Sequence, residues 1–439
     1  MKILVVGGGG REHAILRKLK ENPTVTELYC APGNGGIGYD ATCVPIRATD
    51  IPAMVAFAVE KAIDLAVVAP DDPLVLGMVD ALTAAGIACF GPTAAAARIE
   101  GSKVFSKALM QRYHIPTADY AVFCEADAAM DYITTQNRFP VVIKADGLAL
   151  GKGVIICQTL EEAANAVQDM LLGGRFGKSG STIVVEEFLT GPEVSVLAFT
   201  DGKTMVPMVS SMDHKRALDG DKGLNTGGMG TIAPNPFYTP DIAAQCMETI
   251  YLPTMAAMNA EGCPFCGCLY FGLMLTPSGP KVIEYNCRFG DPETQVVLPL
   301  LDTDLLTVMQ AVAQRRLGEI AVEFSHQAAA CVVLASGGYP GSYQTGKPIA
   351  GLQGGQLATS TIDKKKTVVY HAGTAIRDGQ LVTAGGRVLG VTAVASTLAQ
   401  AVQNAYRAAD TLCFDGLQRR SDIGKSALAW IERTDKEWV

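Results

Sequence analysis

The residues most able to do chemistry lie in the segment VIEYNCRFGDPETQ at 282–295. Its first half is typical of a β-strand, whose side chains alternate between two faces, so Glu284, Asn286 and Arg288 are expected on one face. A carboxylate and an amide oxygen at this spacing supply part of an octahedral Mg²⁺ site, which nucleotide phosphates and water would complete. Arg288 could then hold a transferring phosphoryl group. The alternative, an exposed polar face of an edge strand, is less favoured because the neighbouring segment 269–275 is apolar.

Two lysines and an acidic segment fit a bound nucleotide. Lys144 lies in the apolar, strand-like segment VVIKAD on the same face as Asp146, and its partner is either a phosphate or Asp146 itself. Lys103 follows EGS early in a predicted helix, where a lysine alone would equally suit a solvated face. The segment IVVEEFLTGPE at 183–193 ends a strand with two acids. A chain that leaves its strand there can offer backbone groups to an adenine edge, and Glu193 can reach a ribose.

Three glycine-rich loops could bring backbone N–H groups to anions. GGGG at 7–10 lies between a strand and a helix, where phosphates bind, or it is a tight turn without a ligand. Glu12 occupies the place of the third glycine of G-x-G-x-x-G, which argues against NAD. GLALGKG at 147–153 is one residue short of a P-loop, and we expect a lid over phosphates or a solvent-exposed turn. NTGGMG at 225–230 lies in the long polar loop that contains DHKR at 213–216, and it suits close approach of an anion.

These loops need elements that hold them. Residues 1–101 alternate apolar strand-like runs with helices, which predicts a parallel sheet with right-handed crossovers. Residues 102–326 are expected to form a second domain, in which a compact piece at about 117–192 carries the lid. Residues 327–439 indicate strands with one helix at 397–412, a small α+β domain. The predicted fold class is therefore multidomain, α/β followed by α+β, and agrees with about three domains for 439 residues.

Composition excludes several classes of function. The net charge is −8 without a basic face, so no nucleic-acid partner is expected. No apolar run approaches the ~18–20 residues of a membrane span, and the first residues do not resemble a signal peptide. Twelve cysteines without a secretory signal fit reduced thiols and a cytoplasmic location. CPFCGC at 263–268 invites a zinc or redox interpretation, but no second CxxC or histidine pair accompanies it, so structural thiols are favoured.

Lysines in two separate segments, an acidic hinge, a glycine lid and paired metal ligands together resemble an ATP-grasp ligase. The resemblance narrows to the phosphoribosylamine–glycine ligase family, whose motifs occur in the family's order over nearly the whole chain. They are GGGGREHA, APGNGG, FGPTAAAARIEGSK, VVIKADGLALGKGV, VEEFLTGPEVS, DHKR, NTGGMG, LYFGLM, IEYNCRFGDPETQ, GGYPG, HAGT and GGRVL.

The resemblance implies a pre-ATP-grasp domain, an ATP-grasp domain with a mobile lid and a small C-terminal domain. It also implies a reaction of de novo purine biosynthesis: ATP, glycine and 5-phospho-β-D-ribosylamine give glycinamide ribonucleotide, ADP and phosphate through a glycyl phosphate. ATP and Mg²⁺ (or Mn²⁺) would be required. A carboxylate does not react usefully with an amine, so the acyl phosphate is chemically necessary, and the lid would keep water from hydrolysing it.

Individual residues receive roles from the same resemblance. Those implied in catalysis are Arg288, Lys215 and Asp213. Those implied as metal ligands are Glu284 and Asn286. Those implied in nucleotide binding are Lys103, Lys144, Gly151, Lys152, Gly153, Glu186, Glu187, Phe188, Leu189 and Glu193. Those implied in binding the other substrates are Gly8, Gly9, Gly10, Asn225, Thr226, Gly227, Gly228, Asp291, Pro292 and Glu293.

The chain departs from the family pattern in a few places. Gly8 stands where the family usually has Asn or Ser, Ala69-Pro70-Asp71 replaces Gly-Pro-Glu, and Leu224 replaces a common proline. The first two touch the sugar-phosphate side of the expected site. Three alternatives were weighed: another ATP-grasp ligase of purine metabolism, an NAD-dependent oxidoreductase and an inactive nucleotide-binding protein. The REHA loop together with NTGGMG argues against another ATP-grasp ligase. The missing dinucleotide fingerprint argues against an oxidoreductase, and the intact metal positions argue against an inactive protein. A monomer is expected.

Overall fold

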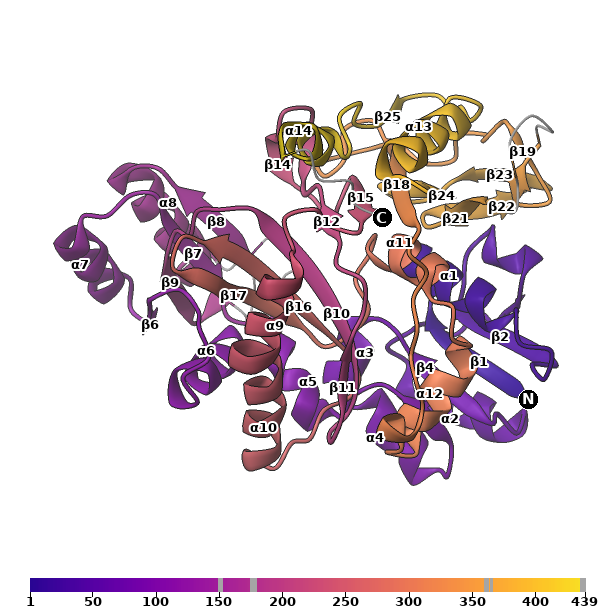
Figure 1. Ribbon diagram of the computed structural model, residues 1–439, viewed down its shortest axis with the longest axis horizontal. Helices are drawn as coiled ribbons and strands as arrows, with labels where there is room; N and C mark the ends of the chain where they lie inside the picture. Colours follow the sequence, from indigo (N-terminus) through magenta and orange to yellow (C-terminus); the bar gives the residue numbers. More distant parts are fainter. Residues whose placement is uncertain (149–152, 174–179, 359–362, 364–365, 435–439) are drawn as a thin grey trace.

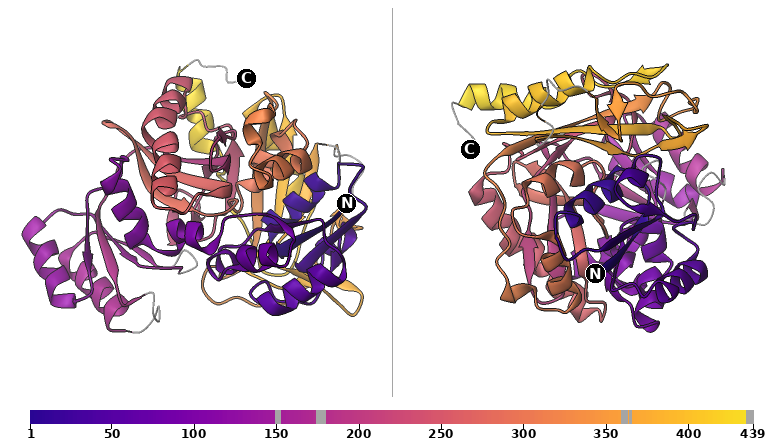
Figure 2. Two further views of the ribbon diagram at one scale, coloured as in Figure 1. Left: turned by 90° about the horizontal axis from the view of Figure 1, so that it is seen from below. Right: turned by 90° about the vertical axis from the view of Figure 1, so that its right-hand side faces the viewer.

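The structure is a computed structural model that describes residues 1–148, 153–173, 180–358, 363 and 366–434. We call residues 1–101 the N-terminal lobe, 117–192 the lid lobe and 327–439 the C-terminal lobe. Figure 1 shows the lid lobe standing to one side, and the N- and C-terminal lobes lying against each other on the opposite side. The left view in Figure 2 shows the same separation of the lid lobe from the rest.

The N-terminal lobe contains the parallel sheet that the sequence predicts. Its five strands lie in the order β3-β2-β1-β4-β5, and every neighbouring pair is parallel. Residues 3–6 of the central strand are fully buried, because helices cover both faces of such a sheet. The elements are β1 (Lys2–Gly7), α1 (Gly10–Leu19), β2 (Glu27–Pro32), η1 (Ile37–Tyr39), β3 (Thr42–Cys43), α2 (Ile51–Glu60), β4 (Leu65–Val68), α3 (Asp71–Val75), α4 (Met78–Ala84) and β5 (Ala88–Phe90).

The lid lobe has a sheet and a hydrophobic core of its own. Its strands lie in the order β6-β9-β7-β8, all antiparallel, and β7 and β8 are paired on either side of the second glycine loop in the sequence. Two helices lead into it, and two more pack on its sheet. The elements are α5 (Ala94–Gly101), α6 (Lys103–Arg112), β6 (Tyr120–Phe123), α7 (Ala126–Gln136), β7 (Val141–Ala145), β8 (Val154–Cys157), α8 (Leu160–Leu171) and β9 (Ile183–Glu187).

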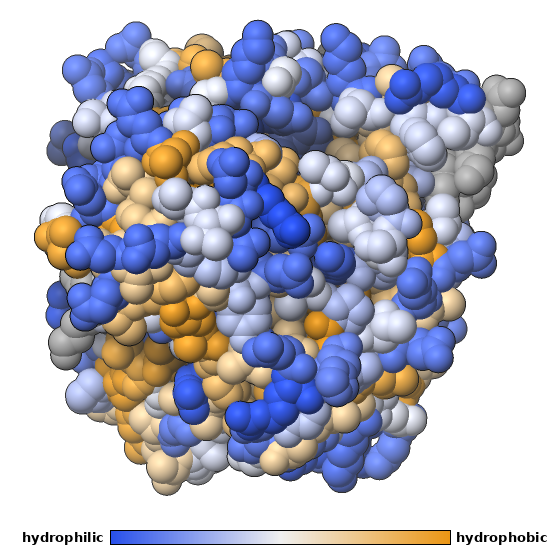
Figure 3. Space-filling model, turned by 90° about the vertical axis from the view of Figure 1, so that its left-hand side faces the viewer, coloured by the Kyte–Doolittle hydropathy of each residue, from blue (hydrophilic) through white to orange (hydrophobic). Residues whose placement is uncertain are grey.

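The lid lobe's core includes Ile133, Ile143, Val167 and Ile183 and is separate from the cores of the other lobes. Seen from its side, the surface mixes hydrophilic side chains with apolar areas (Figure 3).

A four-stranded antiparallel sheet, β11-β10-β16-β17, forms the centre of the molecule. Strand β17, which carries the expected metal ligands, lies at the edge of this sheet, but its Asn286 is buried, so the exposed polar face that the sequence disfavoured is not present. The elements are β10 (Glu193–Asp201), β11 (Met205–Pro207), α9 (Pro240–Cys246), the π-helical turn η3 (Met247–Tyr251), α10 (Leu252–Ala260), β16 (Cys266–Thr276), β17 (Gly279–Asn286), α11 (Thr294–Val297), η4 (Leu298–Leu300), α12 (Leu305–Ala313) and η5 (Leu317–Glu319).

The C-terminal sheet combines strands from two parts of the chain. Its order is β12-β15-β18-β24-β21, and β25 also pairs with β18. Strands β12 and β15 come from the long polar segment between 212 and 233, whereas the others follow residue 327. The elements are β12 (Met212–Asp213), β13 (Arg216–Leu218), β14 (Lys222–Asn225), β15 (Gly230–Ala233), β18 (Ala328–Ser336), β19 (Leu352–Gln353), β20 (Gln356–Leu357), β21 (Thr367–His371), β22 (Thr374–Arg377), β23 (Gln380–Thr383), β24 (Arg387–Ala395), α13 (Leu398–Ala409), β25 (Leu417–Gln418) and α14 (Lys425–Thr434).

Two features bear on the exclusions drawn from composition. Within the described ranges, every helix is too short or too polar to cross a membrane. The thiols of Cys263 and Cys268 are buried, and burial raises the pKa of each above its usual value. Such thiols pack as small apolar groups, as the sequence predicts for CPFCGC.

Candidate active site

The expected metal ligands lie on β17, the edge strand of the central sheet. Glu284 on β17 lies opposite Gly272 on β16, and a Cβ on Gly272 would come 3.1 Å from the Glu284 side chain. The backbone edge of β17 is covered by the lid side of the molecule: Thr117 donates to the carbonyl of Val282 at 2.7 Å, and Lys144 donates to that of Ile283 at 3.1 Å. Segments leading into and within the lid lobe therefore contact the strand that carries these ligands.

Electrostatics keep Glu284 in its charged form. Burial alone would raise the pKa of this carboxyl group, but Lys215, Lys144 and Lys103 outweigh that effect and the pKa lies below its ordinary value. The Lys215 Nζ lies 3.7 Å from Glu284 Oε1. A charged carboxylate and the amide oxygen of buried Asn286 are the oxygen donors that Mg²⁺ or Mn²⁺ prefers, so the residues present fit a divalent cation.

Beside this strand, Glu186 is enclosed by two lysines. Its Oε2 lies 2.9 Å from Lys107 Nζ and 3.0 Å from Lys144 Nζ, whereas its buried Oε1 has no hydrogen-bond partner among the described residues. Burial lowers the pKa of Lys107 to about 8, although Glu186 opposes the shift. An unpartnered buried acceptor next to cations needs a donor, such as the amino group of a purine.

The two partners expected for Lys144 were a phosphate or Asp146, and the Asp146 alternative is wrong. Asp146 accepts instead from the Ser102 hydroxyl and the Val104 N–H, both at 3.1 Å. These groups belong to the start of α6, where a carboxylate satisfies orphan N–H groups. Lys144 is therefore directed to Glu186 and to β17, and Asp146 fixes the first turn of the helix that carries Lys103 and Lys107.

The other expected nucleotide residues surround the same place. Lys103 donates to the carbonyl of Gly147 at 2.8 Å, and burial lowers its pKa. The chain leaves strand β9 after Glu187, which lies 3.6 Å from Lys281, so Phe188 and Leu189 lie outside the strand as expected. Gly153 accepts from the N–H of Ala145 at 2.8 Å at the base of the second glycine loop. Gly151 and Lys152 lie outside the described residues.

Arg288 is positioned by a residue that the sequence analysis missed. Strand β17 ends at Asn286, so strand alternation does not place Arg288, contrary to the expectation. Its Nη2 lies 3.1 Å from Glu100 Oε1, while Glu100 Oε2 accepts from the Cys287 N–H at 2.7 Å. The buried Nε of Arg288 has no partner within the described part of the chain, which leaves it available to a ligand oxygen.

The DHKR segment places a cation and an acid beside the ligand strand. Lys215 lies 3.3 Å from Glu193 Oε2, and Glu193 is the largest cause that raises the pKa of this lysine. Burial and the charge of Glu293 raise the pKa of Asp213 well above its ordinary value. Glu293 in turn accepts from the Ser195 hydroxyl at 3.2 Å. Lys215 is therefore charged, and Asp213 holds a proton more readily than an exposed aspartate.

The third glycine loop packs against the DPET segment. Gly228 has φ +112°, and a Cβ there would come 2.4 Å from Pro292 and 2.6 Å from Asp213. Thr226 caps the turn by donating its hydroxyl to the carbonyl of Lys215 at 2.8 Å, one residue after Asn225 ends strand β14. Only glycine at position 228 permits the close approach to Pro292 and Asp213, because it has no side chain.

Arg387 of the C-terminal lobe ties this loop to the DPET segment. It donates to the carbonyls of Gly227 and Asp291, both at 2.6 Å, and lies 2.9 Å from Asp291 Oδ2. Arg387 belongs to the GGRVL motif, but the sequence alone does not indicate a role for it. The guanidinium fork suits such a junction, since it donates in several directions from one plane.

The first glycine loop faces the same segment. Helix α1 begins at Gly10, and Cβ atoms on Gly9 and Gly10 would lie 3.5 and 3.7 Å from the Asp291 carboxylate. The N–H of Gly9 is taken by Glu12 Oε2 at 2.5 Å, which leaves the N–H groups of the first helical turn to bind an anion. The loops at 7–10 and 225–228 and the segment 284–293 are thus brought together from separate elements, although they lie far apart in sequence.

Comparison with known proteins agrees with this architecture. The fold is that of ATP-grasp enzymes: a biotin carboxylase from Campylobacter jejuni, at 15% identity, superposes with a TM-score of 0.71 over 95% of this chain and 92% of its own. A phosphoribosylamine–glycine ligase from Thermotoga maritima superposes with a TM-score of 0.83 at 33% identity, over 96% of this chain and 100% of its own.

Sequence relatives narrow the class. The Vibrio cholerae phosphoribosylamine–glycine ligase is 48% identical over 98% of this chain and 99% of its own length, and the Brucella melitensis enzyme is 48% identical over 98% of each. The phosphoribosylglycinamide synthetase N domain, ATP-grasp (A) domain and C domain match residues 1–100, 101–294 and 329–426. The chain belongs to the phosphoribosylamine–glycine ligase family, and it is an ATP-dependent ligase of the carboxylate–amine type.

Proposed function

We propose that this enzyme joins glycine to 5-phospho-β-D-ribosylamine at the expense of ATP, giving glycinamide ribonucleotide for purine biosynthesis. The observation that carries the proposal is the convergence of the three parts such a reaction needs. The loop at 7–10 suits a sugar phosphate, the strand pair Glu284 and Asn286 suits a metal-bound nucleotide, and Arg288 follows them with a buried Nε that has no hydrogen-bond partner among the described residues. Family membership of the whole chain supports the same reaction.

The nucleotide would lie between the lid lobe and β17. Lys103 and Lys144 would hold its phosphates, Glu186 and Leu189 its adenine, and Glu193 its ribose. Glu284 and Asn286 would hold Mg²⁺ or Mn²⁺, which neutralises charge on the phosphates of ATP when bound. We propose that the lobe at 117–192, with its separate core, closes on ATP as a unit within a domain of residues 102–326.

The chemistry proceeds in two steps on the substrates themselves. In the first, the glycine carboxylate attacks the γ-phosphorus of ATP, ADP leaves, and Arg288 stabilises the charge on the glycyl phosphate. In the second, the ribosylamine nitrogen attacks the acyl carbon, and the C–O bond to phosphate breaks. The nitrogen then loses a proton, and we propose the ionised form of Asp213 as the acceptor, because a carboxylate whose pKa is raised is a stronger base than an exposed aspartate.

The other residues would orient the acceptor. The sugar phosphate would lie on the N-terminal lobe, at the start of α1. Asp291, Pro292, Glu293 and the third glycine loop would enclose its ribose and amine. The C-terminal domain, residues 327–439, would close this side of the site through Arg387. We further propose a monomer that acts in the cytoplasm, as expected from composition.

The test is ADP release measured with each substrate omitted in turn. Release should require glycine, phosphoribosylamine and Mg²⁺ together, and Glu284→Ala should lose most of it while keeping the fold. Turnover with another amino acid but none with glycine would refute the substrate assignment. Wild-type turnover of Glu284→Ala at ordinary Mg²⁺ would refute the metal role.

A further inference from the structure

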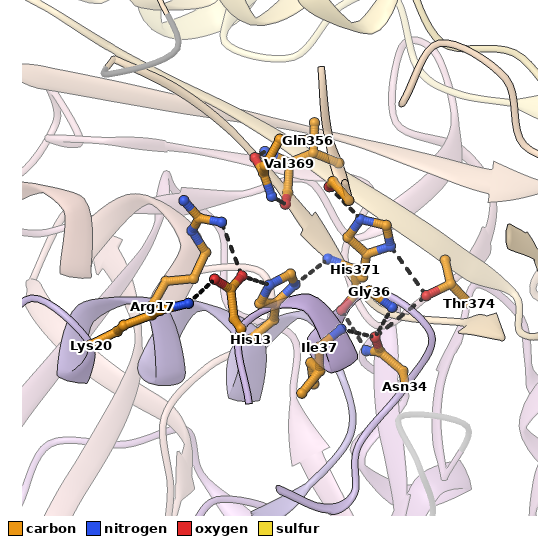
Figure 4. A network of polar contacts seen from close by, with 12 residues as sticks. His13, Arg17, Lys20, Asn34, Gly36, Ile37, Gln356, Val369, His371 and Thr374 are labelled. Atoms are coloured by element: carbon orange, nitrogen blue, oxygen red, sulfur yellow. Dashed lines mark hydrogen bonds and ion pairs between the residues drawn. The ribbon is translucent and has the colours of Figure 1, made fainter. Parts of the chain in front are cut away.

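We propose that Asn34 and the C-terminal lobe's His371 are positioning residues that orient the first glycine loop for the 5′-phosphate of the ribosylamine. The inference rests on the proposed function of that loop and adds residues that no motif assigned to it. Figure 4 shows the polar network that carries it, between α1 and the loop after β2 on one side and strand β21 on the other.

Asn34 joins the glycine loop to the C-terminal lobe. Its Nδ2 donates to the carbonyl of Gly8 at 2.9 Å and to the carbonyl of His371 at 2.8 Å. Its Oδ1 accepts from the N–H groups of Gly36 and Ile37, both at 2.9 Å. The Thr374 hydroxyl makes a longer contact with the same Oδ1 at 3.4 Å. Both N–H donors and the oxygen of the amide are therefore occupied, which fixes the way the amide points.

These contacts hold the peptide unit between Gly8 and Gly9 in one orientation. Asn34 holds its carbonyl, and Glu12 holds its N–H at 2.5 Å. Because the peptide unit is planar, fixing both ends fixes the direction of the chain that enters α1. The N–H groups of the first helical turn, which have no acceptor within the helix, are thereby aimed at one place.

The structure leaves no room for a side chain at position 8. A Cβ on this residue would come 2.5 Å from the carbonyl oxygen of Gly33, in the same segment as Asn34. The family usually carries Asn or Ser at position 8. In this chain Gly8 stands there, and the backbone of residues 33–37 packs directly against the loop.

His371 is held against the N-terminal lobe on several sides. Its N–H donates to Nδ1 of His13 at 2.8 Å, and Nε2 of His13 lies 3.0 Å from Asp40, which places the imidazole proton on Nε2. The His371 ring contacts the carbonyl of Gly355 at 2.8 Å, and it packs so closely on Gly36 that a Cβ there would come 1.8 Å from it. The carbonyl that Asn34 uses is thus fixed relative to α1 (Figure 4).

The decisive experiment compares two ligands that differ only in the phosphate: glycinamide ribonucleotide and its 5′-dephosphorylated riboside. Asn34→Asp keeps the acceptor oxygens and the size of the side chain, but it removes both donors. We expect it to weaken binding of the ribonucleotide about ten- to a hundredfold and of the riboside less than twofold. The KM for ATP should not change, which also reports that the variant is folded.

A matched control separates positioning from general loosening of the C-terminal lobe. Gln356 makes two hydrogen bonds at 3.0 Å to the backbone of Val369, two residues before His371, and contacts neither Asn34 nor Gly8. Gln356→Ala should leave the preference for the ribonucleotide intact. Gly36→Ala, which leaves the Asn34 side chain itself unchanged but pushes the His371 ring away, should reduce that preference.

The outcomes distinguish this inference from the function on which it rests. If Asn34→Asp and Gly36→Ala weaken both ligands equally or neither, while Gly10→Ala abolishes the preference for the phosphate, the positioning role is overturned and the loop keeps its function. If Gly10→Ala also leaves the preference unchanged, the phosphate does not bind at this loop and both proposals fail.

Discussion

The buried pair between Glu100 and Arg288 allows a quantitative prediction for Glu100→Gln. The two charged groups are 3.1 Å apart, and an effective dielectric constant of ~20 gives a Coulomb attraction of about 5 kcal/mol. Part of this offsets the desolvation of both groups, since burial raises the pKa of Glu100 even beside the arginine. The glutamine keeps an acceptor for the Cys287 N–H but leaves Arg288 buried without its counter-charge. We expect a loss of about 2–4 kcal/mol in unfolding free energy.

The catalytic effect should be larger than the effect on binding. Without Glu100, Arg288 would no longer be held at the proposed position of the reacting phosphoryl group, so kcat should fall about a hundredfold while the KM for ATP changes little. Urea unfolding and steady-state ADP release measure the two effects on the same protein.

A second Arg–Glu pair in the chain provides a matched control. Arg316 and Glu319 lie 2.6 Å apart, closer than the buried pair, but both side chains are more than half exposed. Glu319→Gln should leave both the unfolding free energy and kcat nearly unchanged, because solvent screens the interaction. If Glu100→Gln behaves like Glu319→Gln in stability and in kcat, the positioning of Arg288 by Glu100 is refuted.

Three further predictions concern other described contacts. Lys107→Met removes one of the two cations beside Glu186, and it should raise the KM for ATP about tenfold with little change in kcat. An unchanged KM would contradict the role of Glu186 in the nucleotide site. His214, whose pKa burial lowers to about 4, is neutral in the folded protein but has a pKa of 6.5 when unfolded. Stability should therefore fall as pH drops from about 6.5 towards 4, by about 2 kcal/mol at pH 5 from this residue, and His214→Asn should show a shallower slope in urea unfolding at several pH values. Equal slopes would exclude a neutral His214. Gly228→Ala should lose activity and about 2 kcal/mol of stability, because its φ of +112° and the contact with Pro292 leave no room for a Cβ. ADP release and urea unfolding measure the two effects. A fully active variant would show that the loop can move.

The sequence predicted those parts of the fold that local pattern determines. The apolar runs of the first hundred residues predicted a parallel sheet, and VVIKAD was expected to be strand-like; both predictions are confirmed. Periodicity of two or of 3.6 residues is a local property, so it is visible in a short segment.

Contacts between distant segments were not predictable in the same way. Glu100 reaches residues 287 and 288, Lys107 reaches Glu186, and Arg387 reaches Asp291. None of these residues departs from its local pattern: Lys107 follows Lys103 by one helical turn, and Glu100 lies in an ordinary helix. The wrong partner for Lys144 has the same origin, since strand alternation places Asp146 beside it but cannot reveal Glu186 on the neighbouring strand.

The strand that follows the third glycine loop has a consequence for how the enzyme is made. Strand β15 takes its register from β18, with Gly230 opposite Val332 and Ala233 opposite Ala329, about a hundred residues later in the chain. On the ribosome, β15 emerges well before its partner and presents an open edge of unpaired N–H and C=O groups until β18 has followed. The loop at 225–228 and Asp213 therefore reach their final places late in synthesis, after most of the nucleotide-binding residues have emerged.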